Sequence, residues 1–540
     1  MEINLNKNNI IPLLPYSRHT EDIAKKALND EIIPFPNFDS VPFNDSIWEF
    51  EKDGKKTSYQ LYIHSLRVVG ELINYYKKTF DTRYLYKGKQ IMDSWINFSK
   101  TNSTSMTWYD HPTGNRTQVI IELIYYLKAD NKDLDLNIYL AQLKKHCEHL
   151  ENDDNYRPNN HGIMMDKALI MSGLVLSNSN FYLKAKSRLQ QTFWLSYSYK
   201  GVHLENSPEY HLMVTKMYIE LESYLNKNND SLGKEINNML NSAKNYLSKI
   251  KKPDGNVPAI GDSSEIYIKN DDKMDWENFN DIESGLTIIK DKNHKLYLGF
   301  ICGYSTITHK HSDDLSIILN YNSKDYFVDS GKLNYSKTPE RSYVVSNKAH
   351  SSFQLNEKYE KSEMNKYTKE IWTDTYFDTI DYTIVSGFHK KYKETYMRRT
   401  IYYIKKFNLV IVRDYGDSEI KKTWISKFNL NENIKVDSSE NNITVLQLND
   451  DYIALHCLTN QKLNIINNFD NEIVTNPFIS RRANQKINNS QIVFNDENKK
   501  NTEYIFCFSF NEKPKIEVEK KDNYLSIFKE GHEIRLPKID

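Results

Sequence analysis

The hydrophobic pattern of this chain changes its period near residue 280, and no other feature constrains the fold more. Before that point, apolar residues recur every three or four positions, as Leu66, Val69 and Ile73 do in "SYQLYIHSLRVVGELINYYKKTF". This is the spacing of one helix face. After it, short runs such as "LSIILNY" and "DYFVDSG" are separated by turn residues, as in hairpins of β-strands. A helical half followed by a strand half predicts two domains that share an interface.

The length of 540 residues supports this division, because one compact core rarely grows so large. We predict an α+β multidomain protein with a helical domain over residues 1–275, built as a toroid or an array of helical hairpins. An antiparallel strand domain is predicted over residues 276–540. The segment "KKPDGNVPAIGDSSE" ends the last helix and begins the crossover between them. Hairpin turns are predicted at residues 322–324 and 406–408.

Composition and charge exclude several classes of protein. Lys plus Arg and Asp plus Glu number 72 each, and this balance argues against a general nucleic-acid binder. No apolar run is long enough to span a bilayer. The first residues, "MEINLNKNNIIPLLPYSRHT", do not follow the pattern of a secretory signal. The sequence as given therefore predicts a cytoplasmic protein, or a periplasmic or secreted one if a leader is missing. The widely spaced Cys147, Cys302, Cys457 and Cys507 are expected to be buried thiols.

The stretch "ITHKHSDDLSIILNYNSKDYFVDSG" contains a candidate metal site. His309 and His311 stand two apart before a strand-like run, which predicts both imidazoles on one face of the strand entrance. Asp329 follows the next run, and antiparallel pairing would bring it to His311. His350 would then complete a set of two histidines and one carboxylate, which zinc accepts. Two surface histidines and a turn aspartate explain the same pattern equally well.

Four residues have the chemistry that elimination beside a uronic acid requires. The proton on carbon 5 becomes acidic only when the neighbouring carboxylate is neutralised, and an amide or an imidazolium can do this. A base must then remove the proton, and an acid must protonate the departing oxygen. Asn160 and His161 in "NNHG", Tyr210 in "GVHLENSPEYH", and His309 offer these groups. Taken singly, Asn160 could equally cap a helix and Tyr210 could be a packed aromatic residue.

Four further residues are predicted to bind substrate. In "TWYDHPTGNRTQ", Trp108 could stack on a sugar, and Arg116 could pair with a carboxylate in bidentate fashion. A capped turn between helices is the alternative for this stretch. Glu205, near Tyr210, and Tyr343, near His350, complete the predicted set.

The stretches "NNHG", "GVHLENSPEYH", "PAIGDSSE", "HKHSDDLSIILNYNSKDYFVDSG" and "RSYVVSNKAHSSF" occur in this order. Together they resemble the heparinase II/III family of polysaccharide lyases, from about Trp48 to His350. The resemblance implies an N-terminal (α/α) toroid, a C-terminal antiparallel β-sandwich and an active site in the groove between them. It implies no organic cofactor.

The resemblance also implies a role for each motif residue. Asn160 or His161 would bind the uronate carboxylate, Tyr210 would act as base or acid, and His309 would assist. A structural zinc would be held by three side chains, those of His311, Asp329 and His350. The chain departs from the family at Ser351, where an Asn usually follows the last histidine.

The expected function is a lyase that cleaves a uronic-acid-containing acidic polysaccharide by β-elimination and leaves unsaturated uronate ends. One alternative is a glycoside hydrolase on the same architecture, with a carboxylate pair drawn from Asp262, Glu265 and Glu205. Another is a non-catalytic polysaccharide-binding protein linked to capsule or surface polysaccharide metabolism. The sequence does not choose among uronate polymers or between endo and exo action, and it does not indicate an oligomeric state.

Overall fold

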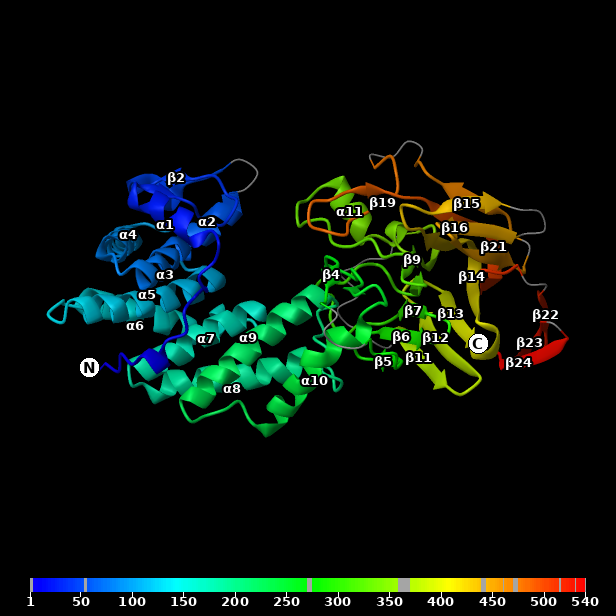
Figure 1. Ribbon diagram of the computed structural model, residues 1–540, viewed down its shortest axis with the longest axis horizontal. Coiled ribbons are helices and arrows are strands. Elements are labelled where there is room, and N and C mark those ends of the chain that lie inside the picture. Colours follow the sequence, from blue (N-terminus) through cyan, green and yellow to red (C-terminus); the bar gives the residue numbers. More distant parts are fainter. Residues whose placement is uncertain are drawn as a thin grey trace. The chain divides into compact units, whose positions relative to one another are not determined.

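The chain forms two compact units. The computed structural model describes residues 3–52, 56–269, 274–357, 370–438, 443–459, 461–469, 474–513, 516–529 and 531–539. Unit 1 comprises Met1–Ser196 and Lys216–Leu240, and unit 2 comprises Tyr197–Thr215 and Asn241–Asp540. Helices dominate before residue 280 and strands after it (Figure 1), so the predicted fold class is confirmed. The predicted domain limits, 1–275 and 276–540, stay a prediction beside this division.

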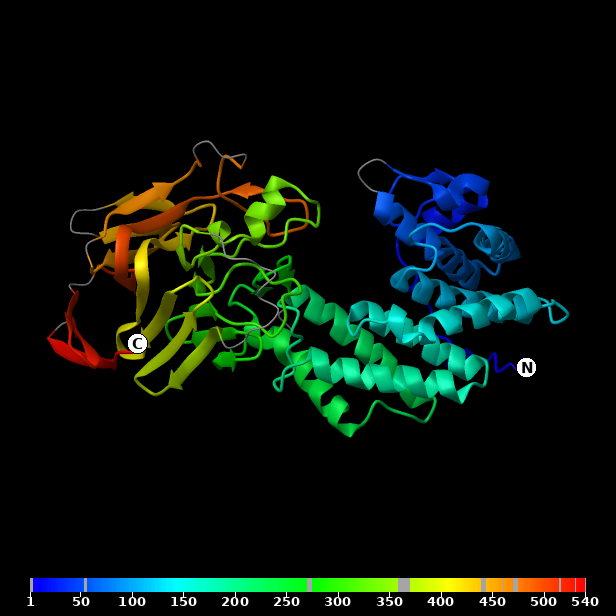
Figure 2. The same cartoon turned by 180° about the vertical axis from the view of Figure 1, so that it is seen from behind.

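The helices before residue 280 follow one another along the chain, and the longest connection, between α1 and α2, contains a small ribbon of strands. They are α1 (Thr20–Leu28), α2 (Lys56–His64), α3 (Arg67–Thr79), α4 (Thr82–Thr101), α5 (Asp110–Asp130), α6 (Asn137–Glu151), α7 (Asn160–Val175), α8 (Ser179–Ser196), α9 (Pro208–Lys227) and α10 (Lys234–Ile250). Strands β1 (Glu31–Ile32) and β2 (Val41–Pro42) form a small ribbon among them. Within unit 1, α3 packs on α4 and α7 packs on α8, as both broad views show (Figures 1 and 2). Among the described residues, no helix combines the length and apolarity needed to cross a membrane.

One run with helical periodicity, residues 58–80, is divided between two helices. The break lies at Leu66, whose φ of 52° is left-handed. Such a conformation costs a residue with a side chain about 1–3 kcal/mol. Leu66 is fully buried, and the burial of its side chain offsets that cost. The apolar spacing predicted the helical conformation but not the break.

The strands of unit 2 form two large antiparallel sheets. The five-stranded sheet has the order β5-β6-β7-β8-β9, and the ten-stranded sheet has the path β11-β12-β13-β14-β21-β17-β16-β15, with β10 paired to β14 and β18 to β21. A three-stranded sheet, β22-β23-β24, follows at the end. The bounds are β3 (Asn256–Val257), β4 (Ile266–Tyr267), β5 (Phe279–Asp281), β6 (Leu286–Asp291), β7 (Leu296–Ile301), β8 (Ser316–Tyr321), β9 (Lys324–Phe327), α11 (Pro339–Val345), β10 (Phe353–Leu355), β11 (Ile371–Asp378), β12 (Tyr382–His389), β13 (Thr395–Ile404), β14 (Leu409–Asn429), β15 (Lys435–Ser438), β16 (Ile443–Leu448), β17 (Asp451–Cys457), β18 (Leu463–Ile466), β19 (Phe478–Ile479), β20 (Ile487–Asn488), β21 (Gln491–Phe510), β22 (Ile516–Lys520), β23 (Tyr524–Lys529) and β24 (His532–Pro537).

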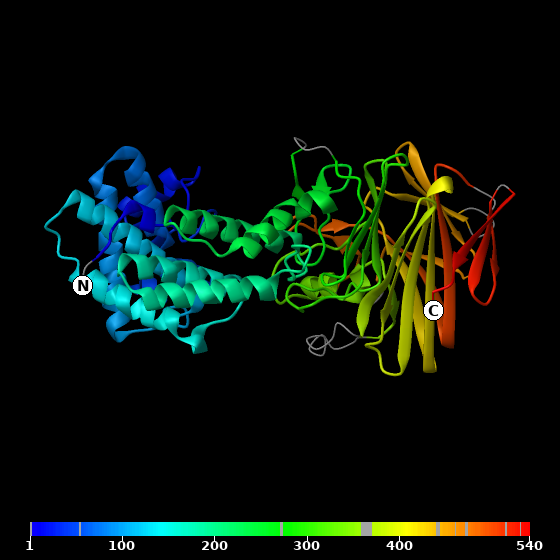
Figure 3. The same cartoon turned by 90° about the horizontal axis from the view of Figure 1, so that it is seen from below.

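Alternation along the strands builds the layers of unit 2. In β7, Leu298 and Phe300 face a core shared with the ten-stranded sheet, whereas Tyr297 and Ile301 face a second core that includes Ile250. The ten-stranded sheet is apolar on both faces in the same way, and its far face packs against the three-stranded sheet. Figure 3 shows the green strands of the smaller sheet beside the yellow and orange strands of the larger one. The predicted sandwich therefore has both faces of its central sheets covered.

Smaller predictions about this region are also confirmed. Strands β8 and β9 form a hairpin around Asn322 and Ser323, and β13 and β14 form one that turns at Asn408. Helix α10 ends at Ile250, where the crossover was expected. All four cysteines are buried and free.

Candidate active site

Three loops of unit 2 meet around a glycine of the "PAIGDSSE" motif. Gly261 has a φ of +55°, and an added Cβ would lie 2.3 Å from the carbonyl oxygen of Asn206 and 2.8 Å from that of His309. The amide of Asn206 donates to the carbonyl oxygens of Thr306 and Thr308 at 2.7 and 3.0 Å. A side chain at residue 261 would force these loops apart. The glycine therefore lets the segment before α9 contact both the Gly261 loop and the histidine loop.

His309 and His311 do not lie on a strand, which corrects the predicted strand entrance. Both residues belong to the loop that precedes β8, and His309 has a left-handed φ of 58°. A strand residue requires φ near −120° or below, so the side chains cannot share a face by strand alternation. They meet through a common partner, the carboxylate of Asp262.

The Asp262 carboxylate binds both imidazoles and a guanidinium. Its Oδ2 lies 3.0 Å from Nδ1 of His309, and its Oδ1 lies 2.9 Å from Nε2 of His311 and 2.5 Å from the Arg341 guanidinium. Burial acts to raise the pKa of Asp262, but hydrogen bonds from the two histidines and the charge of Arg341 hold that pKa well below its usual range. An ionised carboxylate only accepts hydrogen bonds, so both facing ring nitrogens donate.

A phenol lies flat against the His309 ring. The rings of Tyr210 and His309 are stacked, with centroids 3.6 Å apart, and the hydroxyl of Tyr335 donates to that of Tyr210 at 3.2 Å. Nε2 of His309 lies 3.7 Å from a carboxylate oxygen of Glu205. Burial first, and then the nearby carboxylates including Asp262, raise the pKa of Tyr210 despite the Tyr335 hydrogen bond. Tyr210 is therefore a protonated phenol at neutral pH, beside an imidazole whose side chain is 16% exposed.

The predicted metal ligands come together in unit 2. Each of His311, Asp329 and His350 offers one ligand atom, and these atoms lie within 4.8 Å of one another. His311 Nδ1 and His350 Nε2 are buried, and neither has a hydrogen-bond partner among the described residues. Nδ1 of His350 lies 3.2 Å from the Asp329 carboxylate. Two buried nitrogens without partners and one carboxylate are a donor set that fits zinc.

The carboxylate-binding candidates lie in unit 1 at the start of α7. Asn159 caps this helix, since its side chain accepts from the backbone N–H groups of His161 and Gly162. Asn160 is therefore not the N-cap, and the alternative prediction that Asn160 caps this helix was wrong. Nδ1 of His161 lies 3.1 and 3.2 Å from the two carboxylate oxygens of Asp110, the first residue of α5. Although burial opposes it, the hydrogen bond with His161 lowers the pKa of Asp110.

Comparison with known proteins places this architecture in a family. Residues 2–283 match the family model "Heparinase II/III N-terminus", and residues 279–524 match "Heparinase II/III-like, C-terminal". The chain belongs to the heparinase II/III family. No match to a curated protein was found.

Solved structures with the heparinase fold cover nearly the whole chain. The crystal structure of heparinase III matches with a TM-score of 0.78 and 15% identity, over 98% of this chain and 93% of that one. Heparan sulfate lyase HepC from Pedobacter heparinus matches with a TM-score of 0.73 and 14% identity, over 99% and 92%. Chondroitin AC lyase from Streptomyces coelicolor A3 matches with a TM-score of 0.58 and 9% identity, over 95% and 83%. At these identities the likeness establishes a shared fold.

Two predicted substrate-binding residues of this heparinase II/III family member are core residues. Arg116 is 0% exposed, donates to His146 and to the carbonyl oxygens of His64 and Thr107, and stacks on Trp95. Tyr343 is 4% exposed and packs in a small apolar cluster. Both positions are at odds with substrate contact, because a ligand cannot reach these buried groups. Patterns of residue type could not separate a carboxylate-binding arginine from one that supports the fold.

Of the other two binding candidates, Trp108 is partly accessible and Glu205 is buried. Trp108 is half-buried near His149, and the Lys145 ammonium lies 4.8 Å from its ring centroid. Glu205 is largely buried beside His309 in unit 2. Their roles in binding stay predictions.

Sequence reasoning missed three residues that contact the candidate catalytic groups. Asp110 holds His161, Tyr335 donates to Tyr210, and Asp262 had been considered only as a hydrolase carboxylate. The signal for Asp262 was its place in the "PAIGDSSE" stretch, one of those that carry the family resemblance. Asp110 and Tyr335 follow no pattern that distinguishes them from other residues of their type.

Proposed function

We propose that this protein is a polysaccharide lyase that cleaves a uronic-acid-containing acidic polysaccharide by β-elimination and leaves an unsaturated uronate end. The observation that carries the proposal is the stacked pair of Tyr210 and His309, with His309 held through Nδ1 by Asp262. A base and an acid on adjacent rings suit a reaction that removes one proton and supplies another. The names of the structural relatives, lyases of heparan sulfate and chondroitin, support the same class of substrate.

Removal of the carbon 5 proton requires that the uronate carboxylate be neutralised. We assign this task to the amide of Asn160 and the imidazole of His161 at the start of α7. Nδ1 of His161 contacts the Asp110 carboxylate, which fixes the ring and turns Nε2 away from Asp110. The positive end of the helix dipole at the start of α7 adds to the attraction for a carboxylate.

The two stacked rings divide the proton transfers. The Nδ1–H group of His309 donates a hydrogen bond to Asp262. Nε2 of the same ring therefore carries the lone pair that removes the carbon 5 proton. The electron pair then forms the double bond between carbons 4 and 5, and the bond from carbon 4 to the glycosidic oxygen breaks. Tyr210, kept protonated by its raised pKa, gives its proton to the departing oxygen. Solvent returns the proton from the imidazolium to the phenolate after release.

We further propose that His311, Asp329 and His350 hold a structural zinc ion. Their buried nitrogens without partners support this assignment. The ion would join the loop before β8 to the segments that follow β9 and α11, and so stabilise the loop that presents His309.

The hydrolase alternative meets a physical obstacle. A glycoside hydrolase needs a carboxylic acid with a raised pKa as proton donor. Asp262 has a lowered pKa and donates nothing, because its oxygens accept from two imidazoles and one guanidinium. Glu265 lies 2.9 Å from the Lys252 ammonium and 3.4 Å from Arg481. Neither of these two groups is placed to protonate a glycosidic oxygen, which leaves Glu205, beside His309, as the remaining candidate acid for a hydrolase.

Incubation with a panel of heparan-like, alginate-like and capsular uronate polymers tests the class of reaction. A lyase produces an unsaturated sugar that absorbs ultraviolet light, whereas a hydrolase produces reducing ends without that band. Sugar binding without either product, in wild type and Tyr210→Phe alike, would instead identify a binding protein.

A substrate with an activated leaving group tests the division between the rings. Tyr210→Phe should lower kcat on the polysaccharide by about 10²–10⁴-fold, the usual contribution of a general acid. On a uronate with a nitrophenolate at carbon 4, which leaves without protonation, the same variant should recover near wild-type rates, while His309→Ala stays slow on both. Tyr199→Phe removes an exposed hydroxyl from the same unit and should change neither rate. Equal loss on both substrates for Tyr210→Phe would make Tyr210 the base.

A further inference from the structure

One carboxylate in unit 2 contacts both the candidate catalytic imidazole and a candidate metal ligand. Asp262 accepts from Nδ1 of His309 through one oxygen and from Nε2 of His311 through the other. We propose that Asp262 is a positioning residue that couples the metal site to the orientation of His309. This inference rests on the proposed function for the role of His309, whereas its metal-site half stands without that function.

The contact with His309 fixes which of its nitrogens is basic. Because the carboxylate can only accept, the His309 proton resides on Nδ1 and the lone pair on Nε2. The same hydrogen bond sets the plane of a ring that already stacks on Tyr210. Without Asp262 the imidazole could exchange tautomers and rotate, and the base would point at the substrate for only part of the time.

The contact with His311 fixes which nitrogen of that ring can bind a metal ion. A proton on Nε2, shared with Asp262, leaves the lone pair on Nδ1. Nδ1 is the buried atom of His311 that has no hydrogen-bond partner among the described residues, and His311 belongs to the cluster with Asp329 and His350. A carboxylate behind a ligating histidine raises the basicity of that ligand and holds its orientation.

The surroundings of Asp262 keep its carboxylate in one place. The backbone N–H of Asp262 donates to the carbonyl oxygen of His309 at 3.2 Å, and the Ser207 hydroxyl donates to the Asp262 carbonyl oxygen at 2.9 Å. The preceding Gly261 has no room for a side chain. Arg341, which also donates to the carbonyl oxygen of Lys332 at 2.6 Å, supplies the charge that a buried carboxylate requires. A displacement of His311 would therefore be transmitted through Asp262 to His309.

Asp262→Asn tests the coupling with little change of volume. The amide keeps one accepting oxygen but replaces the other with an N–H donor, so it can serve only one of the two imidazoles. The zinc dissociation constant, measured by competition with a chelator, should rise about 10–100-fold, and kcat should fall by a similar factor with KM unchanged. Asp291→Asn is the matched control, because Asp291 lies 3.3 Å from His294 and accepts from Tyr403 outside the site. It should alter neither quantity.

A spectroscopic measurement on the wild type keeps the test independent of folding and of turnover. In ¹⁵N-histidine NMR, His309 of the zinc-loaded protein should be protonated at Nδ1, and removal of zinc by a chelator should give a mixture of tautomers. An unchanged His309 signal after zinc removal, or an Asp262→Asn variant with wild-type zinc affinity and kcat, would overturn the coupling. If no uronate polymer is cleaved while the variant loses zinc affinity and the His309 signal shifts, the proposed function fails and Asp262 still positions both rings.

Discussion

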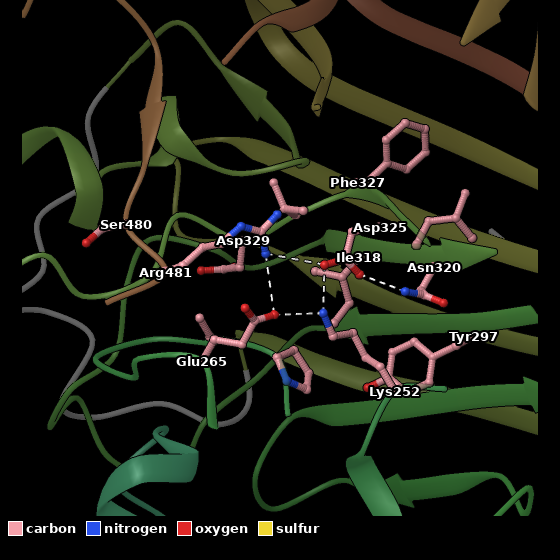
Figure 4. A pocket seen from close by; sticks show the side chains of 14 residues that line it. Lys252, Glu265, Tyr297, Ile318, Asn320, Asp325, Phe327, Asp329, Ser480 and Arg481 are labelled. Carbon is pink, nitrogen blue, oxygen red and sulfur yellow. Dashed lines mark hydrogen bonds and ion pairs between the residues drawn. The ribbon is translucent and has the colours of Figure 1, made fainter. Parts of the chain in front are cut away.

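Unit 2 contains two buried groups of charged side chains that differ in how completely they satisfy one another. The Lys252 cluster consists of Lys252, Asp254, Glu265, Asp325 and Arg481, and most of it is drawn in Figure 4. The Asp262 cluster consists of Asp262, His309, His311 and Arg341. Both join segments that are far apart in the sequence, but only the second has the features of a reactive site.

In the Lys252 cluster, each carboxylate forms an ion pair with a fixed cation. The Lys252 ammonium lies 2.7 Å from Asp325, 2.9 Å from Glu265 and 3.3 Å from Asp254. Burial acts to lower the pKa of Lys252, but the three carboxylates raise it well above its usual range. These carboxylates are close enough together to hold a metal ion, yet the ammonium already supplies the positive charge among them. The cluster therefore stabilises the fold.

In the Asp262 cluster, two imidazoles and one fixed cation, Arg341, surround the carboxylate. The His309 side chain is partly exposed, with Nε2 3.7 Å from a Glu205 carboxylate oxygen, and Nδ1 of His311 has no hydrogen-bond partner among the described residues. Polar groups that serve the fold satisfy one another, so buried nitrogens without partners indicate a role that a ligand completes. Both clusters are charged and largely enclosed, so these properties do not tell them apart. What differs is whether every buried polar atom has a hydrogen-bond or ion-pair partner.

The largest effect on stability is expected in the Lys252 cluster. Lys252→Met leaves three partly buried carboxylates with Arg481 as their remaining cation and should lower the free energy of unfolding by about 3–5 kcal/mol. Lys521→Met is the control, because Lys521 pairs with Glu519 on the exposed surface of the same unit, where a pair contributes about 0–1 kcal/mol. Chemical denaturation measures both. Equal effects would remove the distinction between the clusters, and kcat of the folded Lys252→Met protein should remain at the wild-type value.

A smaller and metal-dependent effect is expected for His311→Ala. This variant should lose bound zinc, and with it the stabilisation that a ligand confers on the folded state, about 2.7 kcal/mol when free zinc is at a hundred times its dissociation constant. Metal content and thermal unfolding with and without chelator measure this loss. If the variant retains zinc and its unfolding temperature, the metal assignment fails. Zinc addition should not change the stability loss of Lys252→Met.

The smallest effect concerns acid stability. Burial acts to raise the pKa of Asp325, but the charge of Lys252 lowers it below its ordinary value. A carboxylate with a lower pKa in the folded protein stabilises that state above the unfolded pKa of about 3.9, and this stabilisation disappears as the pH falls further. Lys252→Met should therefore show a shallower loss of stability between about pH 5 and pH 2. An unchanged acid slope in denaturation curves would show that Lys252 does not lower this pKa.

The sequence predicted the fold class because it depends on local patterns. The three- and four-residue spacing before residue 280 and the alternation after it correspond to the observed helices and sheets. The cluster of His311, Asp329 and His350 forms as expected. The division of the predicted helix at Leu66 was not visible, because a left-handed residue leaves the apolar spacing unchanged.

Only the tertiary structure decided which partner each polar side chain meets. Arg116 and Tyr343 have residue types that suit sugar binding, but packing encloses both. Asp262 stands 47 residues before His309, and their contact depends on loops that meet at Gly261. Hydrophobic periodicity is a property of neighbouring residues, so the sequence displays it directly. The position of a carboxylate between two imidazoles depends on long-range packing, which no local pattern encodes.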